Sequence, residues 1–143
     1  MPFFIDTSTL FKRYQPEKGT DLVCRILEES GQPLYISSIS IIEIISNLKR
    51  LFEIDKITTE EQFHQQRSFF YQDINTLGIT ILDVTAEDII KAESLILKRY
   101  MKSVDSIQLA IALNLQRDDI TFVSSDRKLC KVAAEEGLST LTP

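Results

Sequence analysis

Five short apolar runs recur along the 143-residue chain, and their alternation with longer segments constrains the fold more than any other feature. The runs lie at residues 3–5, 34–36, 79–82, 121–123 and 138–141. Each is too short for a helix and apolar on both faces, which is typical of strands in a parallel sheet that helices cover on both sides. The runs therefore predict five strands of a covered, mostly parallel sheet.

The segments between these runs carry the apolar period of helices. Apolar residues share one face within each of the segments 22–27, 41–52, 63–77 and 89–100, and segment 107–113 is apolar nearly all round. Gly31, Gly78 and Gly137 each end such a segment just before an apolar run, where glycine accepts the left-handed conformation of a helix end. Segment 58–77 belongs to two successive helices with no strand between them, so we expect a helical hairpin beside the sheet.

Strands that alternate with helices imply right-handed crossovers. The predicted fold is therefore α/β, a three-layer α/β/α sandwich with a short, mostly parallel central sheet of about five strands. The length suits a single domain spanning residues 1–143. Hydrophobic residues make up 43% of the chain and charged residues 26%, which excludes collagen-like, low-complexity and disordered chains.

The net charge of −5 argues against a protein that coats nucleic acid through bulk electrostatics. It leaves open a site whose carboxylates have a specific purpose. Cys24 and Cys130 lack metal-type spacing and fall in predicted helices, so we expect reduced thiols and a cytoplasmic protein. Neither a secretory signal nor an apolar run long enough to span a membrane fits the sequence, so no membrane partner is expected.

Two acidic residues follow predicted strands, Asp6 directly after the first and Asp126 three residues past the fourth. Both also precede helices and are good N-cap residues, which is the simpler interpretation of each one alone. Glu43 and Asp105 both fit the capping-box pattern near the starts of apolar helices, Glu43 as the partner of Ser40 and Asp105 as the first residue of a pair. Such apolar surroundings make an ionised carboxylate costly unless something pairs with it.

Taken together, the four acids are expected to converge. In a doubly wound sheet, ligands bind outside the carboxyl ends of the strands, and the first turns of helices open onto the same crevice. Asp6 and Asp126 would reach this crevice from strands, and Glu43 and Asp105 from the first turns of helices. Four carboxylates there repel one another unless a hard cation neutralises them, and an all-oxygen set without His or Cys suits Mg²⁺ or Mn²⁺.

Four motifs contain these acids, namely Phe-Ile-Asp6-Thr-Ser, Ser-Ser-Ile-Ser-Ile-Ile-Glu43, Ser103-Val-Asp105-Ser-Ile-Gln-Leu-Ala and Phe122-Val-Ser-Ser-Asp126-Arg-Lys-Leu. In this order and spacing they resemble the PIN-domain ribonucleases, and within that family the VapC-type toxins of bacterial toxin-antitoxin pairs. The resemblance covers nearly the whole chain. It implies a PIN-like fold and a metal site of these four acids, with Ser124 as a supporting residue. We assign Thr7 and Ser8, which follow Asp6 directly, to the support of the same site. Ser106 and Gln108 depart from the Ala and His that many relatives have around the third acid.

Such a cluster suits phosphodiester hydrolysis, because divalent ions lower the pKa of bound water and stabilise charge on the attacked phosphate. We assign Asp6 and Asp105 as primary metal ligands, Asp126 as a ligand of the same or a second ion, and Glu43 as a ligand or an orienter of water. The chain has a single histidine and no paired groups that would activate an RNA 2′-hydroxyl, so water is the expected attacker. The resemblance adds an RNA substrate, a small antitoxin partner and a homodimer.

Alternatives from other classes stay open. The same fold also fits a PIN-type nuclease of RNA processing that is not a toxin, or a non-catalytic module that binds RNA or protein. An aspartyl phosphatase needs a second Asp two residues after the first, where this chain has Ser8. A receiver domain would need further residues that do not accompany Asp83.

Other candidates are weaker. The basic pairs Lys12-Arg13 and Arg127-Lys128 follow closely on site acids, so they are either contacts to phosphates along an RNA strand or solvated helix faces. His64 lies among Gln and Arg residues on a predicted surface helix, where we expect it to be solvated.

Overall fold

The structure of the chain, a computed structural model, describes all 143 residues. Its elements follow one another as β1 (Phe3–Ile5), α1 (Thr7–Phe11), α2 (Thr20–Glu29), β2 (Leu34–Ser37), α3 (Ser38–Glu53), α4 (Glu60–Thr76), β3 (Ile79–Leu82), α5 (Ala86–Lys98), α6 (Ser103–Leu113), the 3-10 helix η1 (Gln116–Asp118), β4 (Thr121–Val123), α7 (Arg127–Glu135) and β5 (Ser139–Leu141). All five apolar runs form strands, as predicted.

The strands form one all-parallel sheet in the order β3-β2-β1-β4-β5. The first strand therefore lies at the centre, where Phe3 and Phe4 pair with β2 on one side and with β4 on the other. The connections leave β1 and β4 toward opposite halves of the sheet. This divergence at the carboxyl ends of the central strands is where a parallel sheet offers a crevice.

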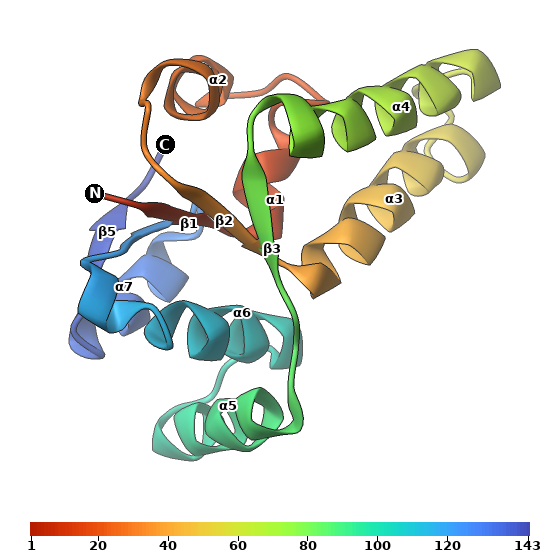
Figure 1. Cartoon of the computed structure of the whole chain (residues 1–143). Helices are drawn as coiled ribbons and strands as arrows, with labels where there is room; N and C mark the ends of the chain where they lie inside the picture. Colours follow the sequence, from red (N-terminus) through yellow and green to blue (C-terminus); the bar gives the residue numbers. More distant parts are fainter.

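Helices cover both faces of the sheet, which gives the predicted three-layer α/β/α architecture (Figure 1). Ile5 and Val123 face a core shared with α2, α3 and α4. Phe4 and Phe122, one residue earlier in each strand, face a second core shared with α5, α6 and α7. Alternate residues of a strand point to opposite faces, so β1 and β4 are almost entirely buried because helices cover both faces.

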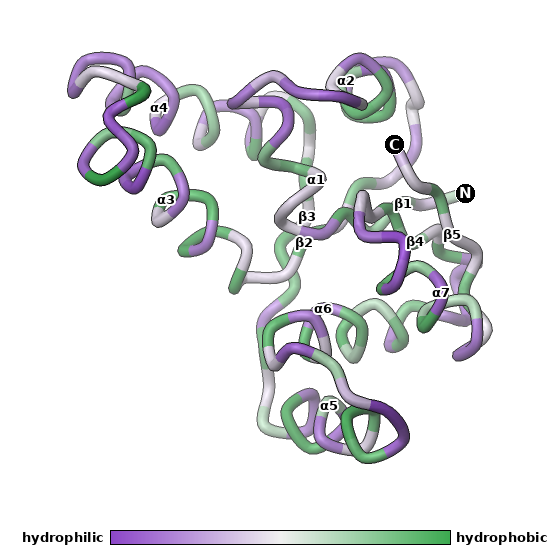
Figure 2. The backbone as a smooth tube through the Cα atoms, turned by 180° about the vertical axis from the view of Figure 1, so that it is seen from behind, coloured by the Kyte–Doolittle hydropathy of each residue, from purple (hydrophilic) through white to green (hydrophobic).

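The predicted helical hairpin is formed by α3 and α4, which extend side by side away from the sheet (Figure 1). The rings of Phe52 and Phe63 stack between them at 6.3 Å. Much of α4 is hydrophilic (Figure 2). None of the helices combines the length and the apolar character that crossing a bilayer requires.

Gly31, Gly78 and Gly137 all have positive φ, at 66°, 65° and 96°, at or just past the ends of α2, α4 and α7. The prediction that glycine ends these helices is confirmed. Residues with a side chain are strained at positive φ, whereas glycine is not.

Candidate functional site

Asp6 is the first residue after the central strand, and its carboxylate is almost fully buried at 4% exposure. Oδ1 accepts a hydrogen bond of 3.0 Å from the backbone N–H of Thr9, so Asp6 caps α1. Oδ2 accepts a 2.6 Å hydrogen bond from the hydroxyl of Ser124, and Ser8 Oγ lies 3.3 Å from both carboxylate oxygens. Burial raises the pKa of Asp6 in spite of these donors. Asp6 can therefore be the N-cap of α1 and a residue of the candidate site at the same time.

Asp126 caps α7 in the same way, with Oδ1 accepting from the backbone N–H groups of Lys128 and Leu129 at 2.9 and 3.2 Å. Its own N–H donates to Ser124 Oγ at 3.1 Å. The hydroxyl of Ser124, which is fully buried, thus accepts from the backbone of one acid and donates to the carboxylate of another. Ser124 sets the position of Asp6 relative to Asp126.

The capping box expected between Ser40 and Glu43 does not form. The N-cap of α3 is Ser37, so Ser40 lies inside the first turn and Glu43 in the second. The carboxylate of Glu43 instead accepts a 2.6 Å hydrogen bond from the hydroxyl of Thr7, a residue of α1. A contact across the fold has replaced the local one that the sequence pattern suggested.

A buried polar cluster surrounds this contact and includes a residue that sequence reasoning noted only as a departure from relatives. Gln108 of α6 donates through Nε2 to Thr7 Oγ1 at 3.0 Å and to Ser40 Oγ at 2.9 Å, with Glu43 Oε1 at 3.4 Å. The Thr7 and Ser40 hydroxyls lie 2.8 Å apart. Since Thr7 gives its only hydroxyl proton to Glu43, Ser40 is the donor in that pair. The protons of the cluster are therefore directed towards Glu43.

Asp105 is the third residue of α6, whose N-cap is Lys102, so the predicted capping pair with Gln108 does not form either. Partial burial raises the pKa of Asp105, and the negative charges of Asp126, Asp6 and Glu43 raise it further. Asp105 thus lies within electrostatic range of the three other acids, and the metal site expected from the four of them stays a prediction. Lys102 acts in the opposite direction and lowers the pKa.

Two hollows open on either side of Asp105. The smaller, of about 110 Å³, is lined by Asp6, Thr7, Ser8, Glu43, Asn47, Val104, Asp105 and Gln108. The larger, of about 350 Å³, reaches Asp126. The sequence analysis missed Asn47. This residue lies one turn after Glu43 on α3, and it reaches the hollow because α3 and α6 both line it.

The two basic pairs differ in their surroundings. Lys12 is 7% exposed and donates through Nζ to the carbonyl of Lys18 at 2.7 Å. Arg13 forms ion pairs with Asp73 at 2.7 Å and Glu28 at 2.9 Å. The prediction that Lys12 and Arg13 contact phosphates is therefore corrected, because the fold itself uses these charged groups.

Arg127 and Lys128 are exposed beside Asp126 and form no side-chain hydrogen bond or ion pair, so they stay candidates for substrate contact.

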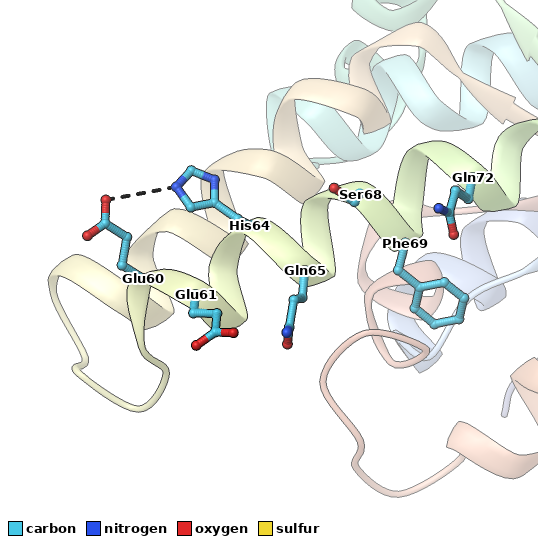
Figure 3. A pocket seen from close by; sticks show the side chains of 7 residues that line it. All are labelled: Glu60, Glu61, His64, Gln65, Ser68, Phe69 and Gln72. Carbon is cyan, nitrogen blue, oxygen red and sulfur yellow. Dashed lines mark ion pairs between the residues drawn. The ribbon is translucent and has the colours of Figure 1, made fainter.

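His64 lies far from the acids, in a surface hollow along α4 (Figure 3). Its ring is 63% exposed and its Nε2 lies 3.8 Å from the carboxylate of Glu60. The prediction of a solvated histidine is confirmed.

The donor set at the sheet edge fits a hard divalent cation. Asp6, Glu43, Asp105 and Asp126 form no ion pair with Lys or Arg. The carbonyl oxygen of Gln108 is buried beside them without a hydrogen-bond donor. Oxygen ligands of this kind suit Mg²⁺ or Mn²⁺. No three of the side chains stand close enough to form a metal-binding group as they are.

The family model described as "PIN domain" matches residues 3–135, a span that includes all four acids. The chain belongs to the PIN-domain family. A search of curated protein sequences finds no match.

Solved PIN-domain structures that resemble the chain include toxins of toxin-antitoxin complexes. FitAcB from Neisseria gonorrhoeae has a TM-score of 0.71 at 16% identity, covering 99% of this chain and 97% of that one. VapC20 from Mycobacterium tuberculosis, described as a sarcin-ricin loop cleaving toxin, has 0.68 at 14%, covering 99% of both chains. VapBC2 from Rickettsia felis, bound to a DNA fragment from its promoter, has 0.67 at 15%, covering 100% and 99%. At these identities the likeness establishes the PIN-domain fold.

Proposed function

We propose that this PIN domain is a metal-dependent endoribonuclease that hydrolyses RNA phosphodiesters at the four-carboxylate site. One observation carries the proposal. Asp105 lines both hollows at the sheet edge, one together with Asp6 and Glu43 and the other together with Asp126, and none of these four acids has an ion-pair partner. Carboxylates gathered without a counter-charge are unfavourable in the protein alone, so their arrangement suits a bound cation.

Each residue of the site has a proposed task. Asp6 and Asp105 would hold the cation, Asp126 would contribute to the same or a second ion, and Glu43 would be a further ligand or would orient a water. Mg²⁺ or Mn²⁺ bound there would supply an activated water and would offset negative charge on the phosphate. Ser124 keeps Asp6 and Asp126 in register, while Thr7 keeps the carboxylate of Glu43 in place.

Water is the proposed attacker. The only histidine of the chain, His64, lies on α4 beside Glu60 and away from the acids. No imidazole is therefore available at the site to activate a 2′-hydroxyl. The products should carry a 5′-phosphate and a 3′-hydroxyl.

The test is RNA cleavage by the purified protein with Mg²⁺ or Mn²⁺, with a chelator, and in the variant Asp6→Asn. Asp83→Asn, which changes an exposed acid outside the site, is the matched control and should cleave like the wild type. Cleavage should stop with the chelator and in Asp6→Asn. Ends bearing 2′,3′-cyclic phosphate would contradict attack by water, and RNA binding without metal-dependent cleavage would favour the binding-module alternative.

We further propose that the nuclease is the toxin of a toxin-antitoxin pair, with a small antitoxin as inhibitor and a homodimer as the functional state. Support comes from the PIN-domain neighbours, several of which were solved as toxin-antitoxin complexes. Sequencing of RNA 5′ ends after a pulse of expression, compared with Asp6→Asn, would identify the target and test the toxin role. The cytoplasmic setting expected from the sequence stays a prediction.

A further inference from the structure

The larger hollow beside the acids has the features of a nucleotide site. It lies between the α5–α6 connection and the start of α7, and its volume is about 350 Å³. Asp105 and Asp126 form the side that faces the candidate metal site. The floor is apolar and consists of Met101, Leu129 and Val132, the first two buried. An apolar floor next to a polar edge suits a ligand with one flat face and one charged end.

The rim of the hollow carries an aromatic ring that the fold does not use. Tyr100 is 87% exposed, the most exposed large hydrophobic residue of the chain. Its ring forms no aromatic pair. Exposed aromatic rings are the surfaces on which unpaired bases stack in proteins that bind single-stranded nucleic acid.

Two cations complete the rim. Lys102 and Lys128 are both exposed, and neither forms an ion pair. Lys102 lines the hollow together with Asp105. Lysines in such a place can contact phosphates that lie next to the one held at the acids.

Ion pairs link the helices next to the hollow. Arg99 forms ion pairs with Glu135 and Glu136 at 3.4 Å, and Lys98 forms one with Glu136 at 2.9 Å. These pairs join the end of α5 to the end of α7, directly before Tyr100. The segments that carry Tyr100 and Val132 are therefore linked close to the hollow.

We propose that this hollow holds one nucleotide of a single-stranded RNA, with its base against Tyr100 and a neighbouring phosphate on Lys102 or Lys128. This inference rests on the proposed function, because it places the nucleotide beside the phosphodiester that is cut. A base inside a duplex is stacked and paired and cannot enter such a site. Tyr100 and the two lysines therefore form the proposed subsite for the nucleotide next to the scissile bond, which an unpaired base can enter.

The test measures RNA binding by fluorescence anisotropy with Mg²⁺ present, in the background of Asp6→Asn so that the RNA stays intact. The probes are an unstructured RNA of about ten nucleotides, within the span of known single-strand sites, and the duplex of the same sequence. Tyr100→Ala should weaken binding of the single strand roughly 5- to 150-fold, the range for loss of one stacked base. Tyr100→Phe should stay within about twofold, because the ring is retained. Duplex binding should not change.

The matched control is Tyr71→Ala, which removes an exposed aromatic ring on a different element, α4. This variant should bind both probes normally. Replacement of Lys102 or Lys128 by Gln should lower the slope of log affinity against log salt concentration by about one, the effect of losing one phosphate contact. Unchanged single-strand binding in Tyr100→Ala would overturn the proposal, as would an equal loss for single strand and duplex. A change of oligomeric state with normal RNA binding would show that Tyr100 is covered by protein instead.

Cleavage by the single variant Tyr100→Ala, with Asp6 intact, separates this inference from the function on which it rests. It should keep metal-dependent cleavage of RNA with a raised KM. If the wild type itself cleaves no RNA with any divalent metal, the proposed nuclease fails, and the anisotropy data still decide whether the hollow binds an unpaired nucleotide.

Discussion

The hydroxyl of Thr7 donates a hydrogen bond of 2.6 Å to Oε1 of Glu43, across 36 residues of sequence. It joins the helix that follows the central strand to the second turn of α3. The same hydroxyl accepts from Gln108, so three helices depend on it for the position of one carboxylate. The geometry of Glu43 is therefore a property of the packed helices and not of its own helix.

We predict that Thr7→Val lowers the rate of RNA cleavage by roughly 10- to 100-fold, the usual effect of removing a group that orients a metal ligand. Valine keeps the shape of the side chain but cannot donate to Glu43. Steady-state cleavage kinetics would measure the loss, with circular dichroism as a check on folding. Thr7→Ser retains the hydroxyl and should recover most of the rate. A fully active Thr7→Val would exclude a role for the Thr7–Glu43 contact.

Ser124→Ala should weaken Mg²⁺ binding by roughly 10- to 100-fold, because Asp6 loses a 2.6 Å hydrogen bond and Asp126 loses the acceptor of its N–H. Isothermal titration with Mg²⁺ gives the affinity directly. Ser125→Ala is the matched control, since the Ser125 hydroxyl contacts Thr9 and no site carboxylate. Equal affinities in the two variants would argue against Ser124 as the support of the site.

Asp105→Asn should make the metal-free protein more stable while it abolishes cleavage. Burial and three neighbouring acids raise the pKa of Asp105, so its ionised form disfavours the folded state at neutral pH. We expect the melting temperature in a chelator to rise by roughly 2–4 °C. Glu93→Gln, at an exposed position of α5, should leave it unchanged. A lower melting temperature in Asp105→Asn would mean that the ionised carboxylate of Asp105 stabilises the fold, which would contradict this prediction.

The affinity for Mg²⁺ should fall as the pH falls. The pKa values of Asp6 and Asp105 are both raised above the ordinary 3.8, so protons compete with the metal at a higher pH than for exposed aspartates. The same raised pKa values mean that the metal-free protein gains stability as the pH falls through them, opposite to the trend in affinity. Titrations at a series of pH values would reveal both trends. A flat pH profile of affinity in the mildly acidic range would contradict these shifts.

Arg13→Gln should destabilise the protein by about 3–5 kcal/mol, because it leaves the buried carboxylate of Asp73 with only Tyr14 as a partner. Arg127→Gln, at an exposed position beside Asp126, should change stability by less than about 0.5 kcal/mol and should weaken RNA binding instead. Urea denaturation and anisotropy separate the two effects. Normal stability with weak RNA binding in Arg13→Gln would restore the original interpretation of the Lys12-Arg13 pair.

Much of the architecture follows from local pattern. Asp6 and Asp126 could be placed at one sheet edge because each follows an apolar run, and parallel strands end on the same side. The glycine ends of helices could be predicted because the left-handed conformation is a local property. The α3–α4 hairpin followed from two helical segments without a strand between them.

Contacts between distant residues could not be predicted in this way. Ser40 and Glu43 form a capping-box pattern, but Ser37 begins the helix, and Thr7 supplies the hydrogen bond instead. Arg13 looks like a substrate contact in the sequence because its partner Asp73 lies 60 residues away. In both cases a local pattern admits several partners, and only tertiary packing selects one of them.

The hydrogen bond between Ser124 and Asp6 joins residues that are 118 positions apart. During synthesis, a ribosome-bound chain that has released only its first hundred residues contains Asp6 and Glu43 but neither β4 nor Asp126. The central strand then lacks one of its two neighbours, and Asp6 at its end lacks the hydrogen bond from Ser124. Under the proposed function, the growing polypeptide should not cleave RNA until residues 121–126 have left the exit tunnel and docked.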